Sequence, residues 1–540
     1  EYTIMNNKII VKNIPDIFRA GMAGGWITYN GASLEQPLTL ECDVLVIGTG
    51  AGGGTAAEIF ANQGLQVVML EEGPLRSSND FDMQENKAYS SLYQEGLTRG
   101  TADGAFAILQ GRAVGGSTTV NWTASFRTPP QTLEHWTRVH GLKGFTEAEM
   151  TPWFERMEQR LNISKWQQAP NANNNVIAKG CERLGYEWDI IPRNVSGCWN
   201  LGYCGTGCPT NAKQSMLVTT VPAALAKGAQ LVHRARAHQL IIDGDQVRGI
   251  SGYGLAENGI DRTQPIEVRA RHTVMACGGI NGPGLLLRSN APDPHNRIGK
   301  RTFLHPVPAT LADFPERIDG FYGAPQSVYS DHFQWRDGVA GPAGFKVEVP
   351  PMHPGFVASI GMLHGEAHSA QMNRLRHLNM MIALIRDGFV EQSPGGEVFL
   401  RDDELPGIHY EINDYLREAI VRAWKTMAEI QFAAGANAVR PVHSMSRYQT
   451  NLADTVAHIE QLDLAVNQMR VGSAHVMGGC AMGEDPATSV VDSNGKFHHL
   501  EGLHIMDGST FPTSIGANPQ LSIYGMVARQ ATALGEQLLV

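Results

Sequence analysis

The sequence predicts an α/β fold built on a parallel sheet, from observations that stand close together near the N-terminus. An apolar, β-branched run over 44–47 is typical of a strand buried on both faces. Glycines follow it at once, and an Ala-rich segment over 55–62 has the composition of a helix. A second apolar run over 66–70 then completes a strand–helix–strand unit, which places two strands in parallel.

The glycines in this unit have the spacing of a dinucleotide-binding turn. Gly48, Gly50 and Gly53 form G-x-G-x-x-G, and Glu71 ends the second run. In such units the glycines allow a tight turn, a close approach to a pyrophosphate and close helix packing, and the acid accepts hydrogen bonds from a ribose. With 59 glycines in 540 residues the spacing alone could belong to a structural turn. The order of strand, turn, helix, strand and acid favours a dinucleotide site.

Length and composition limit the number of domains and the classes of partner that the chain can have. A chain of 540 residues exceeds one ordinary core and predicts two or more domains. The net charge of −10 argues against nucleic acid as a partner. No run of apolar residues is long enough for a membrane-spanning helix, so none is expected.

A second glycine-rich stretch strengthens the cofactor prediction. Residues 111–122, GRAVGGSTTVNW, join two glycines to three hydroxyl side chains, a nest suited to phosphate or to the polar edge of a flavin. Together with the N-terminal unit, this stretch resembles the glucose–methanol–choline (GMC) oxidoreductases. Further blocks follow in that family's order, at 274–289, 475–483, 503–509 and 517–523. The resemblance is closest to long-chain alcohol oxidases and their bacterial relatives, on 205–230, Leu304-His305-Pro306 and the pair Asn518-Pro519.

The resemblance implies an α/β chain with a Rossmann-like FAD-binding domain and a discontinuous substrate domain built on a mostly antiparallel sheet. The expected boundaries are an N-terminal extension at 1–40, an FAD-binding domain at 41–130, 215–310 and 466–540, and a substrate-binding domain with its cap at 131–214 and 311–465. Within the last we expect strands at 344–349, 397–400 and 409–412. A helix should begin after Asn413 and stop at Gly435.

FAD, rather than NAD, is the cofactor that the resemblance implies. It places the flavin ring near Gly116, Ser117, Asn121, Asp507, Gly508 and Pro519, the pyrophosphate near Gly50, Gly52 and Arg112, the ribose on Glu71, and the adenine on the backbone of Ala237 in a strand over 231–242. Some relatives attach the flavin through a histidine just before the loop asparagine. Val120 stands at that position and has no nucleophile, so we expect FAD to bind non-covalently.

The resemblance also implies the reaction, oxidation of a hydrophobic primary or secondary alcohol to an aldehyde or ketone. The flavin takes the hydride. His475 matches the family's active-site histidine and is expected to act as the base, and Asn518 matches a second position that hydrogen-bonds the substrate oxygen. A lone histidine is more often a hydrogen-bonded core residue, and the family context favours the catalytic interpretation. The alternatives are a lyase or photodecarboxylase of the same fold without net flavin redox, and a non-catalytic flavoprotein subunit.

Three cysteines form a separate candidate site. Cys198, Cys204 and Cys208 have C-x5-C-x3-C spacing, and three thiolates suffice for a three-iron cluster. The spacing resembles that of iron–sulfur sugar dehydrogenases in the family. Such a cluster would pass electrons to an accepting subunit, which slightly favours a dehydrogenase over an oxidase. Reduced packing cysteines, zinc or a disulfide are the alternatives.

Overall fold

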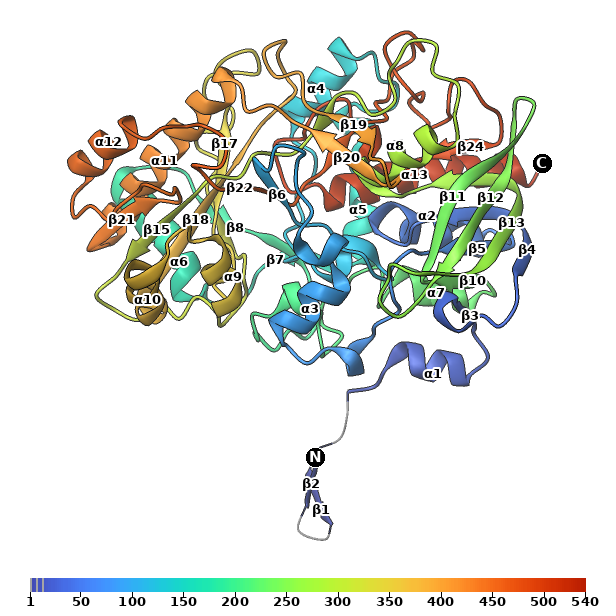
Figure 1. The fold of residues 1–540 in the computed structure, drawn as a ribbon, viewed down its shortest axis with the longest axis horizontal. Coiled ribbons are helices and arrows are strands. Elements are labelled where there is room, and N and C mark those ends of the chain that lie inside the picture. The colour runs from blue at the N-terminus through green and yellow to red at the C-terminus, as the bar shows by residue number, and fades with distance from the viewer. Residues whose placement is uncertain (1, 6–7, 12–13) are drawn as a thin grey trace.

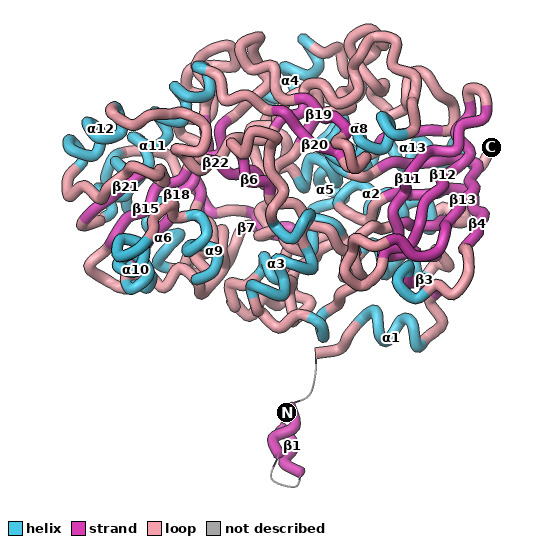
Figure 2. The backbone as a smooth tube through the Cα atoms, viewed as in Figure 1, coloured by secondary structure: helices cyan, strands magenta, loops and turns pink. Residues whose placement is uncertain are grey.

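The computed structural model describes residues 2–5, 8–11 and 14–540. Over these residues the chain forms two main sheets, each covered by helices and lying side by side in Figure 1. Figure 2 shows the longest strands in these two sheets, with long loops and a few short strands between them. The predicted mixture of an α/β part and a mostly antiparallel part is confirmed.

The larger sheet contains the predicted dinucleotide-binding unit. Its described strands run in the order β11 (Ala235–Asp243), β12 (Gln246–Leu255), β13 (Arg262–Met275), β4 (Leu38–Ile47), β5 (Val67–Leu70), β10 (Gln230–His233) and β3 (Ile27–Asn30), with β24 (Leu503–Ile505) also on β13. From β13 to β3 all neighbours are parallel, whereas β11, β12 and β13 form an antiparallel meander. The apolar run 44–47 lies in the middle of the sheet and is almost fully buried, as both-face burial of a parallel strand requires.

Helices cover both faces of this sheet. They are α1 (Ile17–Ala23), α2 (Ala51–Asn62), α5 (Glu147–Arg160), α7 (Thr220–Ala226), α8 (Gly278–Arg288) and α13 (Gln520–Leu538). The C-terminal helix α13 packs against α2 and α5, so helices far apart in the sequence share one core.

Helix α2 begins four residues earlier than the sequence predicts. The expected start was Thr55, but the helix already includes Gly52, Gly53 and Gly54. Glycine is a poor helix former, and here tertiary packing overrides that preference. A Cβ on Gly53 would lie 1.8 Å from the carbonyl oxygen of Gly48, and one on Gly52 would lie 1.9 Å from that of Met506. The glycines therefore allow α2 to lie directly against neighbouring backbone.

The smaller sheet is antiparallel throughout. Its order is β17 (Phe345–Glu348), β18 (Leu378–Ile385), β15 (Ala309–Asp313) and β21 (Ala438–Pro441). Around it lie α6 (Ala172–Leu184), α9 (Pro354–Ile360), α10 (Gly365–Asn373), α11 (Asp414–Ala434) and α12 (Leu452–Glu460). The predicted helix is confirmed as α11, with Asn413 as its N-cap and Gly435 in the left-handed conformation at its end. Its apolar stripe packs in the second core.

Two predicted strands differ in the structure. The run 231–242 is not one strand, because Arg234 has a φ of +52° and breaks it into β10 and β11, which are not hydrogen-bonded neighbours in the strand order. The strand expected at 409–412 lies instead at Pro406–His409, where it pairs as β20 with β19 (Glu397–Leu400). Tyr410 and Ile412 are buried but lie outside β20, since apolar burial alone does not fix a strand boundary.

Short strand pairs attach the C-terminal segment to both parts of the fold. β22 (Val471–Ser473) pairs with β6 (Phe106–Ile108), and β23 (Met477–Gly478) pairs with β14 (Thr302–Phe303). The remaining described elements are β1 (Tyr2–Met5), β2 (Lys8–Val11), β7 (Ile163–Lys165), β8 (Asp189–Ile190), β9 (Pro192–Asn194), β16 (Val328–Tyr329), α3 (Glu85–Leu92) and α4 (Pro130–Val139). Across the described part of the chain, every helix is too short or too polar to cross a bilayer.

We expect Gly53→Ala to lower the free energy of unfolding by about 1–3 kcal/mol or more, because the added methyl group overlaps the carbonyl oxygen of Gly48. Gly282→Ala is the matched control. Gly282 lies inside α8, and a Cβ there would meet no atom closer than 3.9 Å, so this change should be neutral or stabilising by up to ~1 kcal/mol. Urea unfolding of both variants measures the difference, and equal stabilities would contradict the packing argument.

Candidate active site

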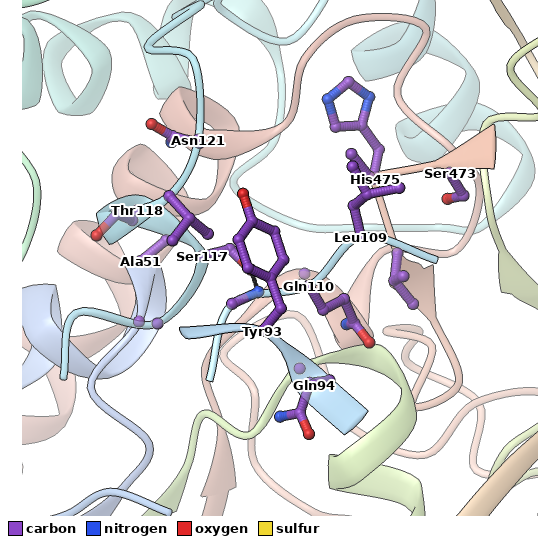
Figure 3. Close-up of a pocket in the computed structure, with 18 of the residues that line it drawn as sticks. Ala51, Tyr93, Gln94, Leu109, Gln110, Ser117, Thr118, Asn121, Ser473 and His475 are labelled. Atoms are coloured by element: carbon purple, nitrogen blue, oxygen red, sulfur yellow. Dashed lines mark hydrogen bonds between the residues drawn. The ribbon is translucent and has the colours of Figure 1, made fainter. Parts of the chain in front are cut away.

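A cavity of about 370 Å³ lies where the two sheets face one another. One side is made by the carboxyl ends of β4 and β5 and the start of α2, where parallel sheets commonly bind ligands. The other side comes from β15, β18 and α9 of the smaller sheet. In Figure 3, His475 and Ser473 lie across from Ala51, Thr118 and Asn121.

The start of α2 is shaped to receive a phosphate. Its N-cap is Gly50, no side chain caps the helix, and the first intrahelical bond runs from Gly54 N–H to Gly50 O at 2.8 Å. The N–H groups before Gly54 therefore point out of the helix at its positive end. A Cβ on Gly50 would meet only the Cα of Gly116, at 3.7 Å, so open space remains beside it.

Glu71 lies on the cavity wall, but protein groups already use much of its carboxylate. Oε2 accepts hydrogen bonds from the backbone N–H and the hydroxyl of Thr49, at 3.0 and 2.7 Å, and Oε1 accepts one from Gly73 N–H at 2.9 Å. Burial raises the pKa of Glu71. Its carboxylate thus fixes the turn after β4 and keeps only its remaining lone pairs for a ligand.

Glu72 also lines the cavity and was not predicted. It receives ion pairs from Arg112 at 2.8 Å and from Arg236 at 2.9 Å. Burial raises the pKa of Glu72, but the two guanidinium groups outweigh it and hold that pKa well below its ordinary value. Arg112 also donates to the carbonyl of Gly259 at 2.8 Å, so its side chain is held away from the cavity.

The structure brings most of the predicted site residues together. Those lining the cavity are Gly48, Gly50, Gly52, Glu71, Gly116, Ser117, Asn121, Ala237, His475, Asp507, Gly508, Asn518 and Pro519. Gly53 and Arg112 do not line it. Gly53 sits in the contact between α2 and the turn, which is the packing role that its spacing predicts. Arg288, from α8, lines the cavity and carried no sequence signal beyond its place in a helix.

His475 faces the cavity from the loop after β22. Burial, together with the nearby charge of Lys346, lowers the pKa of His475 to about 3, so its ring is neutral near pH 7. Its Nδ1 lies 3.2 Å from Nδ1 of His305, a fully buried residue. His305 in turn accepts a hydrogen bond at Nε2 from the backbone N–H of Gly516, at 3.2 Å. Nδ1 of His475 is thus engaged by protein, and Nε2 remains for the cavity.

Asn518 is fixed by a buried acid. Its Nδ2 donates to Oε2 of Glu348 at 3.1 Å, and its Oδ1 is buried without a partner among the described residues. Gln326 donates to the same carboxylate oxygen at 2.7 Å. Since the amide nitrogen is turned toward the acid, the amide oxygen is the free acceptor.

Glu348 and Lys346 occupy alternate positions on β17, so they share one face of the sheet. Burial raises the pKa of Glu348 and lowers that of Lys346 to about 8. The Lys346 ammonium lies 3.0 Å from the ring centroid of Phe126 and 4.0 Å from that of Tyr329. The aromatic faces stabilise this buried cation, which lies close enough to His475 to disfavour its protonation.

The far wall of the cavity is apolar. Met380, Ile382 and Leu384 lie at alternate positions of β18 and point to the same face. Phe356 and Ile360 of α9 complete this wall. The cavity therefore joins a polar end, with His475 and Asn518, to a hydrophobic end.

Within the described residues, the three clustered cysteines are not arranged as a metal ligand set. In the portion of the chain that the structure describes, no group of three or more His, Cys, Asp or Glu side chains is placed to hold a metal ion. The Sγ of Cys198 accepts from the backbone of Asn200, that of Cys204 faces Arg193, and that of Cys208 faces Thr210. The iron–sulfur hypothesis thus gains no support, and close spacing in sequence did not bring the thiols into one ligand set.

Comparison with known proteins gives a consistent result. Models of the N- and C-terminal parts of GMC oxidoreductases match residues 89–307 and 392–527. A long-chain-alcohol oxidase of Arabidopsis thaliana is 29% identical over 504 residues, covering 90% of this chain and 66% of the relative. The chain thus spans about two thirds of that relative's length. The 6'''-hydroxyparomomycin C oxidase of Streptomyces lividus is 28% identical, with 92% of each chain covered.

Solved structures share the fold at lower identity. Formate oxidase from Aspergillus oryzae superposes with a TM-score of 0.68 at 14% identity, over 93% of this chain and 99% of that one. Pyridoxine 4-oxidase from Mesorbium loti gives a TM-score of 0.67 at 18% identity, over 91% and 99%. Because the two family models together match more than half of the chain, the chain belongs to the GMC oxidoreductase family.

Proposed function

We propose that this protein binds FAD non-covalently and uses it to oxidise a hydrophobic primary or secondary alcohol. Family membership supports FAD as the cofactor. The cavity residues fit that molecule, because the uncapped start of α2 and the space beside Gly50 suit its pyrophosphate. Val120 lines the cavity without a nucleophile, which supports non-covalent binding.

The observation that carries the proposal is the two-ended cavity. When bound, FAD supplies the acceptor for the hydride that leaves the alcohol carbon. His475 and Asn518 hold the hydroxyl group at the polar end, and the β18 side chains receive the hydrocarbon at the other end. Long-chain-alcohol oxidases among the relatives support the same substrate class.

We propose that oxygen is the electron acceptor. The argument for a dehydrogenase depended on a cluster at the three cysteines, and within the described ranges no group of three or more His, Cys, Asp or Glu side chains is arranged as a ligand set. Several relatives are named as oxidases. Hydrogen peroxide formed in proportion to aldehyde or ketone would support this route, whereas turnover that depends on an added one-electron acceptor would contradict it.

The direct test is the visible spectrum of the purified protein. We expect a bound flavin whose absorption bleaches when a long-chain, aromatic or sterol alcohol is added without oxygen. A lyase or photodecarboxylase of this fold would turn over its substrate while the flavin stays oxidised, so the same measurement separates the two classes of reaction.

Gly50→Ala should weaken FAD binding at least tenfold, because its methyl group enters the space beside the start of α2. The apoprotein should keep the wild-type melting temperature, since no protein atom lies within 3.7 Å of that methyl position. Flavin titration of the apoprotein measures the affinity, with Gly282→Ala as the control. Unchanged affinity would place the pyrophosphate elsewhere.

His475→Ala should slow flavin reduction by the alcohol about 10²-fold or more, the usual effect of removing a positioned acid–base or hydrogen-bonding group. FAD should remain bound, and Asn518→Ala should have a smaller effect. Stopped-flow absorbance under anaerobic conditions measures both rates. Wild-type reduction in the His475 variant would show that the hydroxyl group is held by other residues.

Met380→Gln keeps the side-chain length but places an amide in the apolar wall. We expect KM for a long-chain alcohol to rise about tenfold, because the hydrocarbon then contacts a polar group that lacks a partner. KM for a short alcohol, which does not reach β18, should change little and serves as the internal control. An equal rise for both alcohols would place the hydrocarbon along another wall.

A further inference from the structure

His305 belongs to the Leu304-His305-Pro306 stretch, which the sequence associates with alcohol oxidases without giving it a role. In the structure it is fully buried behind His475 and does not line the cavity. Its backbone has a φ of +47°, a left-handed conformation that is strained for a non-glycine residue and persists only where the surroundings impose it.

The surroundings impose it through Asp387. The carboxylate of Asp387 accepts hydrogen bonds from the backbone N–H groups of Leu304 and His305, at 3.1 and 3.3 Å. The hydroxyl of Ser473 bonds to the carbonyl of Leu304. The loop that carries His305 is thus attached directly to the segment that carries His475, two residues after Ser473.

The hydrogen bonds of His305 determine where its proton lies. A backbone N–H can only donate, so the bond from Gly516 requires a lone pair on Nε2 of His305. A neutral imidazole then carries its proton on Nδ1, and burial lowers the pKa of His305 well below its ordinary value, so the ring is neutral. Nδ1–H of His305 faces Nδ1 of His475 at 3.2 Å, which must therefore be the acceptor.

We infer that His305 is a positioning residue that fixes the tautomer of His475, so that His475 presents a protonated Nε2 to the cavity. The N–H of Gly516 donates to His305, and the Nδ1–H of His305 donates to His475. The Nε2–H of His475 is then the donor that faces the cavity. If His475 carried its proton on Nδ1 instead, Nδ1 of His305 would have to accept it and the proton of His305 would move to Nε2. That N–H would then face the N–H of Gly516, and neither could accept. The backbone of Gly516 thereby sets a proton position two side chains away.

This inference deepens the proposed function and rests on it for its catalytic meaning. His475 then meets the alcohol oxygen as a hydrogen-bond donor, and Oδ1 of Asn518, which is buried without a partner among the described residues, accepts a hydrogen bond from the hydroxyl group and orients it without removing its proton. Two groups of opposite character hold one hydroxyl group and orient the carbon that it bears. The base role that the sequence assigns to His475 would need the opposite tautomer.

The first test reads the tautomer and does not depend on activity. Protein labelled with ¹⁵N-histidine and containing its flavin is examined by two-bond ¹H–¹⁵N NMR near pH 7, and the His475 signals are assigned by their loss in His475→Ala. We expect a protonated Nε2 and an unprotonated Nδ1. A protonated Nδ1 on His475 would overturn the inference while leaving alcohol oxidation untouched.

The second test compares two variants of His305. Gln can accept from Gly516 through its oxygen and donate to His475 through its nitrogen, whereas Met fills similar space and does neither. We expect His305→Gln to keep the His475 tautomer and to reduce its flavin within about threefold of the wild-type rate. His305→Met should lose the single tautomer and slow reduction about tenfold or more while FAD stays bound. Equal tautomer signals and equal rates in the two variants would show that His305 only fills space.

Discussion

The arrangement of this protein depends on how closely the backbone of α2 approaches its neighbours. Side chains ordinarily separate the backbone of a helix from neighbouring strands and loops. Gly52 and Gly53 have no side chains, so the backbone of α2 lies in contact with the turn after β4 and with the segment before Asp507. The start of the helix thereby reaches the floor of the cavity. The price of this contact is three glycines in a helix, which tertiary packing must offset.

The C-terminal segment is the second constraint. Between β22 and α13 it passes from the core around the smaller sheet to the core around the larger one and supplies His475, Asp507 and Asn518 in turn. Asp507 accepts from Gly278 N–H at 2.7 Å and from Ser509 N–H at 2.8 Å, so it ties the start of α8 to its own turn. One stretch of chain therefore connects the cofactor end of the cavity with the reactive end. A displacement of its backbone at one end would move residues at the other.

Much of this could be predicted from the sequence, because the relevant signals are local. Strand, glycine turn and acid follow one another directly, and α11 is marked by its cap, its stripe and its terminal glycine. The residues that tune the site carry no such signal. Glu348 and Lys346 lie on β17 and His305 follows β14, and only the packing of these strands beside the C-terminal segment brings them to Asn518 and His475.

The predictions that were not confirmed also concern features that depend on tertiary structure. The single strand expected over 231–242 is broken by one residue in the left-handed conformation, which an apolar pattern does not reveal. The spacing of Cys198, Cys204 and Cys208 suggested a common ligand set, but each thiol turns to a different neighbour. Short separation in sequence keeps residues near one another, but the conformation of the loop decides in which direction each side chain points.

The uncapped start of α2 links cofactor supply to the amount of folded protein. Its first N–H groups have no capping side chain, so a bound phosphate supplies contacts that the empty protein lacks. A ligand that binds only the folded state adds stability by mass action, about 2.7 kcal/mol at a concentration about 100 times its Kd. In a cell short of flavin, a larger fraction of this chain would therefore unfold and be degraded, so flavin availability would set the enzyme's abundance as well as its activity.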